Sequence, residues 1–175
     1  MLDLNLEEII IIIVRILGSV PVIFFPFLGS ILAIMTDLSD LFLMNFLDLG
    51  GVSNYQQLDK TLDLFYMLTF LIVALRWHGY FKIISICLFV FRIVGVILFF
   101  TFDNRIYLLY FPNFFEFWIL FIVIYKKIIS SKISNSALTF ILTISIFTKI
   151  AHEIFIHGIK TLDNYTLPEF IKLFY

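Results

Sequence analysis

The sequence predicts an all-α polytopic integral membrane protein, a single transmembrane helical domain over residues 1–175 with about five transmembrane helices and a C-terminal interfacial segment. The chain is 62% hydrophobic and 14% charged, whereas a soluble domain is about half apolar and about a quarter charged. Its 23 phenylalanines present more apolar surface than a water-soluble fold of this length hides. Several apolar stretches also reach the roughly 20 residues that a helix needs to cross a bilayer.

The first apolar segment, Ile9–Met35, contains a charge and two helix-breaking residues. Arg15 lies near its start, and Pro21 and Pro26 interrupt its middle. Because a charged side chain is costly at the bilayer centre, we expect residues 4–17 to form an interfacial helix that leads into the first span. The opening letters, MLDLNLEE, are acidic where a secretory signal is basic, so this segment is expected to be retained.

Four further segments have the length and apolar character of a span, and short polar stretches separate them. They are Leu58–Leu75, Ile83–Phe102, Ile106–Tyr125 and Ala137–His157. Backbone groups in lipid must be hydrogen-bonded within the protein, and these segments are too uniformly apolar for barrel strands, so each is expected to be a helix. The tail after residue 158 has the apolar spacing of a short amphipathic segment on the membrane surface.

The distribution of positive charge predicts the orientation, because basic residues favour the cytoplasmic side. Five crossings place the two termini on opposite faces. The face of the N-terminus then holds the larger basic set, Arg15, Arg76, Lys82, Lys126, Lys127 and Lys132, and the other face holds Lys60, Arg105, Lys160 and Lys172. The sequence therefore predicts a cytoplasmic N-terminus.

Two charges fall in the middle of predicted spans. Arg92 lies in the third span and Glu116 in the fourth, and each would cost roughly 2.5–3.5 kcal/mol if it faced lipid. Each lies about 12 residues from the short turn between the spans, so at about 1.5 Å per residue they reach the same depth. We therefore expect an intramembrane ion pair between Arg92 and Glu116, either as a structural staple or as a working charge in a substrate or ion pathway.

Four aspartates are expected to gather at one membrane face. Asp59 and Asp63 open the second span at i, i+4 spacing and share one helix face, while Asp37 and Asp40 leave the first span on the same side. Stabilisation of a helix start by acidic side chains is the structural explanation. The functional explanation is a metal site formed by these four residues, since carboxylate oxygens suit a divalent cation such as Mg²⁺.

The fifth predicted span ends on this same face. Glu153 and His157 follow i, i+4 spacing there and extend a stripe that begins at Lys149. The stretch H-E-x-x-x-H lacks the spacing of the zinc motif H-E-x-x-H. Glu153 and His157 are therefore a candidate additional polar site, and the alternative is an amphipathic helix end with a lysine reaching the interface.

The letters D-L-S-D at 37–40 and D-K-T-L-D at 59–63 resemble part of the signature of the CDP-alcohol phosphatidyltransferases. That family places D-x-x-D-G-x-x-A-R before G-x-x-x-D-x-x-x-D. The resemblance implies metals held by the aspartates and transfer of a phosphoalcohol group from a CDP donor. The chain departs from the signature at Leu41 and Tyr55, which stand where the family has glycine, in the absent Ala-Arg pair, and in a longer aspartate spacing.

No complete catalytic motif is present, so no catalytic residue and no cofactor-binding residue is assigned. The favoured function is an accessory or structural subunit that packs within a larger membrane complex, with membrane lipid and other membrane-protein subunits as partners. The alternatives are a metal-dependent membrane enzyme acting on lipid or phosphate groups at the acidic face, and a small transporter. A net charge of −1 provides no basic face for phosphates, which argues against nucleic acid as a partner.

Overall fold

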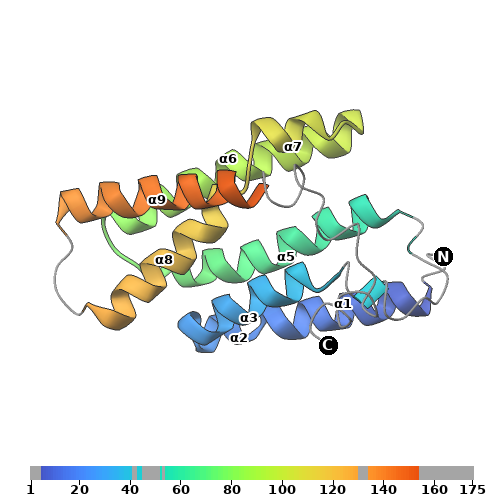
Figure 1. Ribbon diagram of the computed structural model, residues 1–175, viewed down its shortest axis with the longest axis horizontal. Coiled ribbons are helices and arrows are strands. Elements are labelled where there is room, and N and C mark those ends of the chain that lie inside the picture. Colours follow the sequence, from blue (N-terminus) through green and yellow to red (C-terminus); the bar gives the residue numbers. More distant parts are fainter. Residues whose placement is uncertain (1–4, 41–42, 45–51, 53, 130–133, 154–175) are drawn as a thin grey trace, which may run out of the picture.

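Helices account for the regular structure of the described part of the chain. The computed structural model describes residues 5–40, 43–44, 52, 54–129 and 134–153. These ranges contain no strand, and the prediction of an all-α fold is confirmed for them. The helices (Figure 1) are α1 Leu6–Ser19, α2 Pro21–Phe24, α3 Pro26–Leu38, α5 Tyr55–Leu75, α6 Tyr80–Phe102, α7 Ile106–Tyr110, α8 Phe114–Ile128 and α9 Asn135–Glu153. The predicted surface segment after residue 158 lies outside the described residues.

The segment predicted as the first span folds back on itself. Helix α1 begins at a capping box, in which the Asn5 backbone N–H donates to the Glu8 carboxylate at 3.1 Å. Pro21 and Pro26 stand at the start of α2 and α3, where a missing N–H costs little, and each ends the helix before it. The chain reverses through α2, and α3 runs back along α1 (Figure 1).

Two glycines allow close packing within this hairpin, Gly18 between its arms α1 and α3 and Gly29 against the connecting helix α2. A Cβ atom at Gly18 would lie 2.4 Å from Thr36 Oγ1, and one at Gly29 would lie 2.4 Å from the Val22 backbone nitrogen. The arms have 14 and 13 residues, and at about 1.5 Å per residue each is shorter than a hydrocarbon core of about 30 Å. The prediction of one span across Ile9–Met35 is therefore wrong. Because the chain reverses, the end of α3 returns toward α1.

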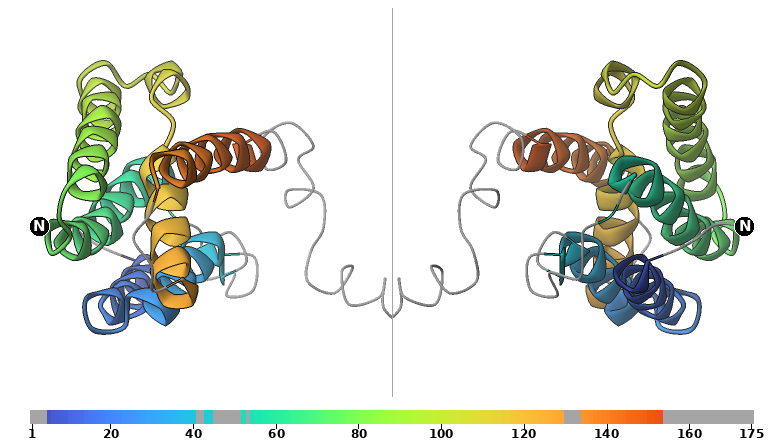
Figure 2. Two further views of the ribbon diagram at one scale, coloured as in Figure 1. Left: turned by 90° about the vertical axis from the view of Figure 1, so that its left-hand side faces the viewer. Right: turned by 90° about the vertical axis from the view of Figure 1, so that its right-hand side faces the viewer.

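The remaining helices form a bundle around α8. Helix α8 contacts α3, α5, α6 and α9, while α1 packs against α3 and α5. Seen from the end, the α1–α3 hairpin, α6 and α9 lie on different sides of α8 (Figure 2). Phe115, Trp118 and Ile122 of α8 belong to the hydrophobic core. The Trp118 indole N–H donates to Ser85 Oγ of α6 at 2.8 Å, so this buried polar group is satisfied.

The fourth predicted span is divided into two helices. Helix α7 ends at Tyr110 and α8 begins at Phe114, and Pro112 between them has no N–H with which to continue a helix. Gly95 of α6 allows a close approach at this break, since a Cβ atom there would lie 2.3 Å from Phe111 Cβ. Helix α8 leaves the break in a different direction from α7 (Figure 1). Depth in this segment therefore cannot be obtained by counting residues from the preceding turn.

Two of the described segments have the length and apolar character of a membrane span. They are Tyr80–Phe102 and Ile106–Ile128, each of 23 residues, with mean hydropathies of 2.8 and 1.7. They support association of the chain with a membrane, which is the general part of the sequence prediction. Helix α3 is also apolar but shorter.

The two ends of the bundle differ in their acidic residues. The acidic end, on the right in Figure 1, is where α1 begins, α3 ends and α5 begins. It holds Glu7, Glu8, Asp37, Asp40, Asp59 and Asp63. The basic end, on the left, is where α5 ends, α6 begins and α8 ends. It holds Arg76, Lys82, Lys126 and Lys127.

Candidate functional site

Arg15 is the centre of a buried ionic cluster at the acidic end. Its side chain is 2% exposed, and its guanidinium contacts all four aspartates of the predicted site. Nη2 lies 2.5 Å from Asp37 Oδ1 and 2.8 Å from Asp63 Oδ1. Nη1 lies 2.5 Å from Asp40 Oδ2 and 3.3 Å from Asp59 Oδ1. The structure therefore brings the four predicted residues together, around an arginine that we expected at the membrane interface.

The α1–α3 hairpin and the start of α5 build this cluster. Asp37 lies in the last turn of α3 and returns to the side of Arg15, because α3 runs back along α1. Asp59 and Asp63 lie one turn apart on α5, and α5 packs against α1. A guanidinium carries five N–H donors in a planar arrangement, which suits contact with several carboxylates at once. One side chain thus connects three segments of the chain.

Two further cations reach the cluster. Lys60 Nζ lies 2.6 Å from Asp59 Oδ2 and 2.8 Å from Asp63 Oδ2. Arg92 Nη2 of α6 lies 3.8 Å from Asp63 Oδ2. With all groups ionised, the four aspartates face three cations, which are Arg15, Lys60 and Arg92. One carboxylate is in excess, and a buried excess charge is costly, so the cluster favours binding a proton or a further cation.

The surroundings of Asp40 raise the pKa of its carboxyl group into the neutral range. Its side chain is 1% exposed, and its Oδ1 atom has no hydrogen-bond partner among the described residues. Burial raises the pKa of Asp40, the Arg15 guanidinium opposes this change, and the Asp59 carboxylate adds to it. The resulting pKa is about 7. Asp40 is therefore a group of the cluster that exchanges a proton near neutral pH.

Three of the aspartates also have the arrangement of a cation site. One carboxylate oxygen from each of Asp37, Asp59 and Asp63 lies within 4.8 Å of the others. Oxygen ligands of this kind fit Mg²⁺ or Mn²⁺, so the donor set is suitable for a divalent cation. Arg15 and Lys60 contact the same carboxylates. A bound metal would therefore have to displace at least one of these two side chains.

Arg92 and Glu116, expected to form an ion pair with each other, have other partners. Arg92 Nη1 donates to the backbone carbonyl of Phe111 at 2.7 Å, a group that the helix break before Pro112 leaves available. Glu116 lies in the first turn of α8, beyond that break. The expectation assumed two straight helices joined by a turn. Because the chain changes direction at Pro112, equal separation from the turn does not ensure contact, and no ion pair between these two residues is found among the described contacts.

Glu116 belongs to a second polar cluster, which joins α5, α8 and α9. Its Oε2 atom accepts hydrogen bonds from the Tyr66 hydroxyl at 3.3 Å and from the Asn113 amide at 3.4 Å. Lys149 Nζ of α9 lies 3.7 Å from the same oxygen and supplies the countercharge. The Asn113 amide also donates to the Tyr66 hydroxyl at 2.6 Å. Since Tyr66 follows Asp63 by about one turn of α5, it lies between the two clusters.

Sequence reasoning missed Arg15 as a site residue, although a signal for it was present. An ionisable residue inside an apolar segment is costly unless it is paired, and this makes it a candidate functional residue. Lys149 was expected on a stripe with Glu153 and His157, and the structure places it beside Glu116. His157 and the side chain of Glu153 lie outside the described residues, so the additional polar site stays a prediction.

Comparisons of the chain with protein-family models, with curated proteins and with solved structures found no match. The resemblance to the phosphatidyltransferase signature therefore depends on the aspartate spacing alone.

Replacing Arg15 by glutamine should lower the free energy of unfolding by about 3–5 kcal/mol, because it leaves buried carboxylates without their countercharge. Thermal or denaturant unfolding in detergent micelles measures this change. Arg105→Gln is the matched control, since Arg105 is exposed and contacts the Gln56 side chain. The control should change stability by less than about 0.5 kcal/mol. Similar losses in both variants would contradict the central role of Arg15.

Stability should fall as the pH rises from about 4 to about 7. The pKa of Asp40 is 3.8 in its ordinary state and about 7 in the fold, so the folded protein binds more protons between these values. The stabilising proton is fully present below the lower value and is lost above the higher one, an effect of at most about 4 kcal/mol. Asp40→Asn should flatten the dependence of the unfolding midpoint on pH. Coincident profiles for wild type and variant would refute this assignment.

Proposed function

We propose that the protein is a small multi-pass membrane protein that serves as an accessory or structural subunit of a larger membrane complex. The observation that carries the proposal is the combination of buried ionic groups with an exterior rich in large apolar side chains. Arg15, Asp63, Arg92 and Glu116 are at most 5% exposed, while large apolar side chains cover much of the exterior. This arrangement is stable where the surroundings of the bundle are themselves apolar.

The apolar exterior extends over several sides of the bundle. Side chains that are more than half exposed occur on the α1–α3 hairpin, on α6, on α7 and on α9. They include Leu17, Phe24, Phe25, Leu28, Met35, Ile83, Val90, Ile97, Leu109, Phe140 and Phe147. Large exposed apolar areas are typical of surfaces that contact a membrane or another protein. Their presence on opposite sides of α8 supports lipid as the general surrounding (Figure 2).

The α1–α3 hairpin supports contact with a further subunit. Its arms are shorter than the hydrocarbon core, so neither arm crosses a bilayer alone. Phe24, Phe25 and Leu28 at and beside its tip are more than two-thirds exposed. Helices of a neighbouring subunit would bury this tip, and close packing between helices is what stabilises association inside a membrane.

The ionic clusters support a structural role. Arg15 connects α1 with α3 and α5, Arg92 connects α6 with α5, and Lys149 connects α9 with α8. In an apolar surrounding, a packing arrangement that separated these partners would leave charges unpaired at a high cost in free energy. The clusters therefore determine which helices are neighbours. The countercharges of Arg15, Arg92 and Lys149 come from side chains of the same chain.

The full chain should remain in membranes that are washed with alkaline carbonate, because its apolar exterior has no stable state in water. After extraction with a mild detergent, its native size should exceed that of the monomer with its micelle, and a harsher detergent should reduce the size. Release into the carbonate wash would contradict the membrane assignment. A monomeric size in every detergent would contradict the assignment as a subunit and leave the membrane assignment intact.

The excess carboxylate at the acidic end favours a second candidate, a metal-dependent membrane enzyme acting on lipid or phosphate groups. A divalent cation held by Asp37, Asp59 and Asp63 would remove the excess negative charge. Such an ion, when bound, polarises a phosphate group for transfer. The aspartate spacing that resembles the phosphatidyltransferase signature agrees with this chemistry. The position of Arg15 among the same carboxylates favours the structural role over it.

Mn²⁺ distinguishes the two candidates. If the aspartates hold a metal, Mn²⁺ should raise the unfolding midpoint of the wild type in metal-free detergent solution, and Asp59→Asn should remove that shift. Asp103→Asn is the control, since Asp103 is exposed and adopts a left-handed backbone conformation that asparagine tolerates. A wild type whose midpoint is insensitive to Mn²⁺ excludes the second candidate.

A further inference from the structure

In the described part of the chain, the half of the bundle that includes the basic end contains no acidic residue. The sequence contains no aspartate or glutamate between Glu8 and Asp37, between Asp63 and Asp103, or between Glu116 and Glu153. The turns at the basic end fall inside these three intervals, because the hairpin and the later helices reverse there. Among the described residues, the basic side chains at that end therefore have no carboxylate to neutralise them.

Aromatic rings hold the basic side chains in place at this end. Lys126 Nζ lies 4.3 Å from the centre of the Trp77 ring and 4.8 Å from the centre of the Phe81 ring. Lys127 Nζ lies 5.7 Å from the centre of the Phe27 ring. Contact with a ring face stabilises an ammonium group but does not cancel its charge. These lysines are exposed, so their charge stays available to a ligand.

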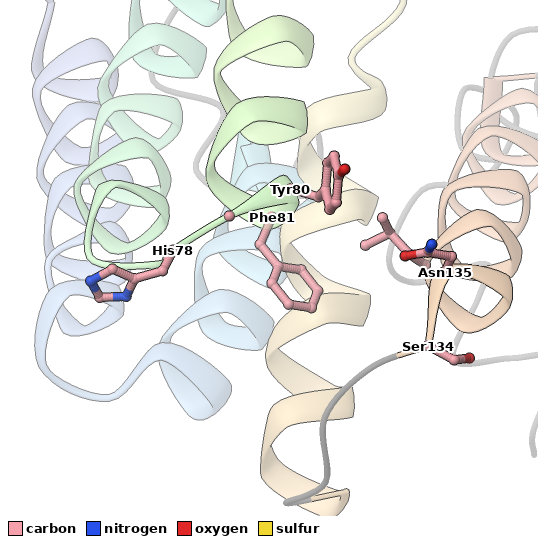
Figure 3. A pocket seen from close by; sticks show the side chains of 7 residues that line it. His78, Tyr80, Phe81, Ser134 and Asn135 are labelled. Carbon is pink, nitrogen blue, oxygen red and sulfur yellow. The ribbon is translucent and has the colours of Figure 1, made fainter.

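A groove opens between the start of α6 and the start of α9 at the same end. It has a volume of about 330 Å³ and is lined by His78, Gly79, Tyr80, Phe81, Ser134, Asn135 and Leu138. Tyr80 and Phe81 lie on one side, with Ser134 and Asn135 opposite (Figure 3). Phe81 is shared between the groove and the contact with Lys126. The groove therefore combines apolar walls, hydroxyl and amide groups, and a neighbouring cation.

We propose that this groove and Lys126 beside it, with Lys127 as a further cation at the same end, bind the headgroup of an anionic phospholipid. The proposal depends on the membrane assignment made above. A phosphodiester would meet the positive charge of Lys126 and the polar groups of Ser134 and Asn135, while the acyl chains would lie along the apolar exterior of α6 and α9. Aromatic side chains with basic neighbours are favoured at the level of lipid headgroups.

The same surface assigns an orientation. Anionic lipids give the cytoplasmic leaflet its negative potential, so the basic end faces the cytoplasm. Asn5, the first described residue, lies at the opposite end, where α1 begins (Figure 1). This orientation is opposite to the cytoplasmic N-terminus that the sequence predicts.

The test uses the full chain in neutral phosphatidylcholine–detergent micelles, to which phosphatidylglycerol is added while thermal unfolding is followed. The wild-type midpoint should rise with the phosphatidylglycerol fraction. In the double variant Lys126→Gln/Lys127→Gln the apparent affinity should fall roughly 25-fold, since each cation near an anionic surface contributes about a factor of five. Arg105→Gln, which removes an exposed cation far from the groove, should respond like the wild type.

Several results would overturn the proposal or one of its premises. Equal responses of the double variant and of Arg105→Gln, or a wild type that does not distinguish the two lipids, would overturn the site. An equal rise caused by inorganic phosphate at matched ionic strength would assign the surface to a free anion and would overturn the lipid proposal. Release of the chain by carbonate would refute the membrane assignment. Retention in the membrane without a preference for phosphatidylglycerol would refute only the headgroup site.

Discussion

The burial of Arg15 among four aspartates is the interaction on which the rest of the structure depends. A guanidinium removed from water is stable only if hydrogen-bonding anions replace its hydration, and no single segment of this chain supplies enough of them. Asp37 and Asp40 come from the end of the hairpin and its continuation, and Asp63 from α5. The contact therefore determines that α1, α3 and α5 meet at one level of the bundle.

The charge balance of this cluster connects stability with possible chemistry. Four carboxylates and three cations leave one negative charge that the described side chains do not neutralise. A proton at Asp40 and a divalent cation between Asp37 and Asp59 are two solutions to the same electrostatic problem. They predict different responses to pH and to Mn²⁺, because a proton is exchanged wherever water reaches the carboxylate, whereas a metal requires several oxygens at once.

The reversal of the chain at Pro21 and Pro26 has a second consequence at the far end of the bundle. It places the turn between α1 and α3 beside the turn between α5 and α6, where Arg76 donates to the Ile23 carbonyl at 2.7 Å. The acidic residues of the described chain then lie away from that end, and the lysines of α8 have no carboxylate partner among the described residues. The reversal at Pro21 and Pro26 thus contributes to the difference in charge between the acidic and the basic end, and the proposed orientation depends on this difference.

The sequence by itself determined the helical class and the shared face of Asp59 and Asp63, because both follow from composition and from the local period of the helix. It also placed the four aspartates at one level. Only the tertiary structure decided that Arg15 is their common partner and that Arg92 and Glu116 form ion pairs with Asp63 and Lys149. These outcomes depend on a hairpin and on a helix break at Pro112, whose directions are determined by packing between segments distant in the sequence. Residue counting gives depth along a straight helix, but it does not show where the chain turns back.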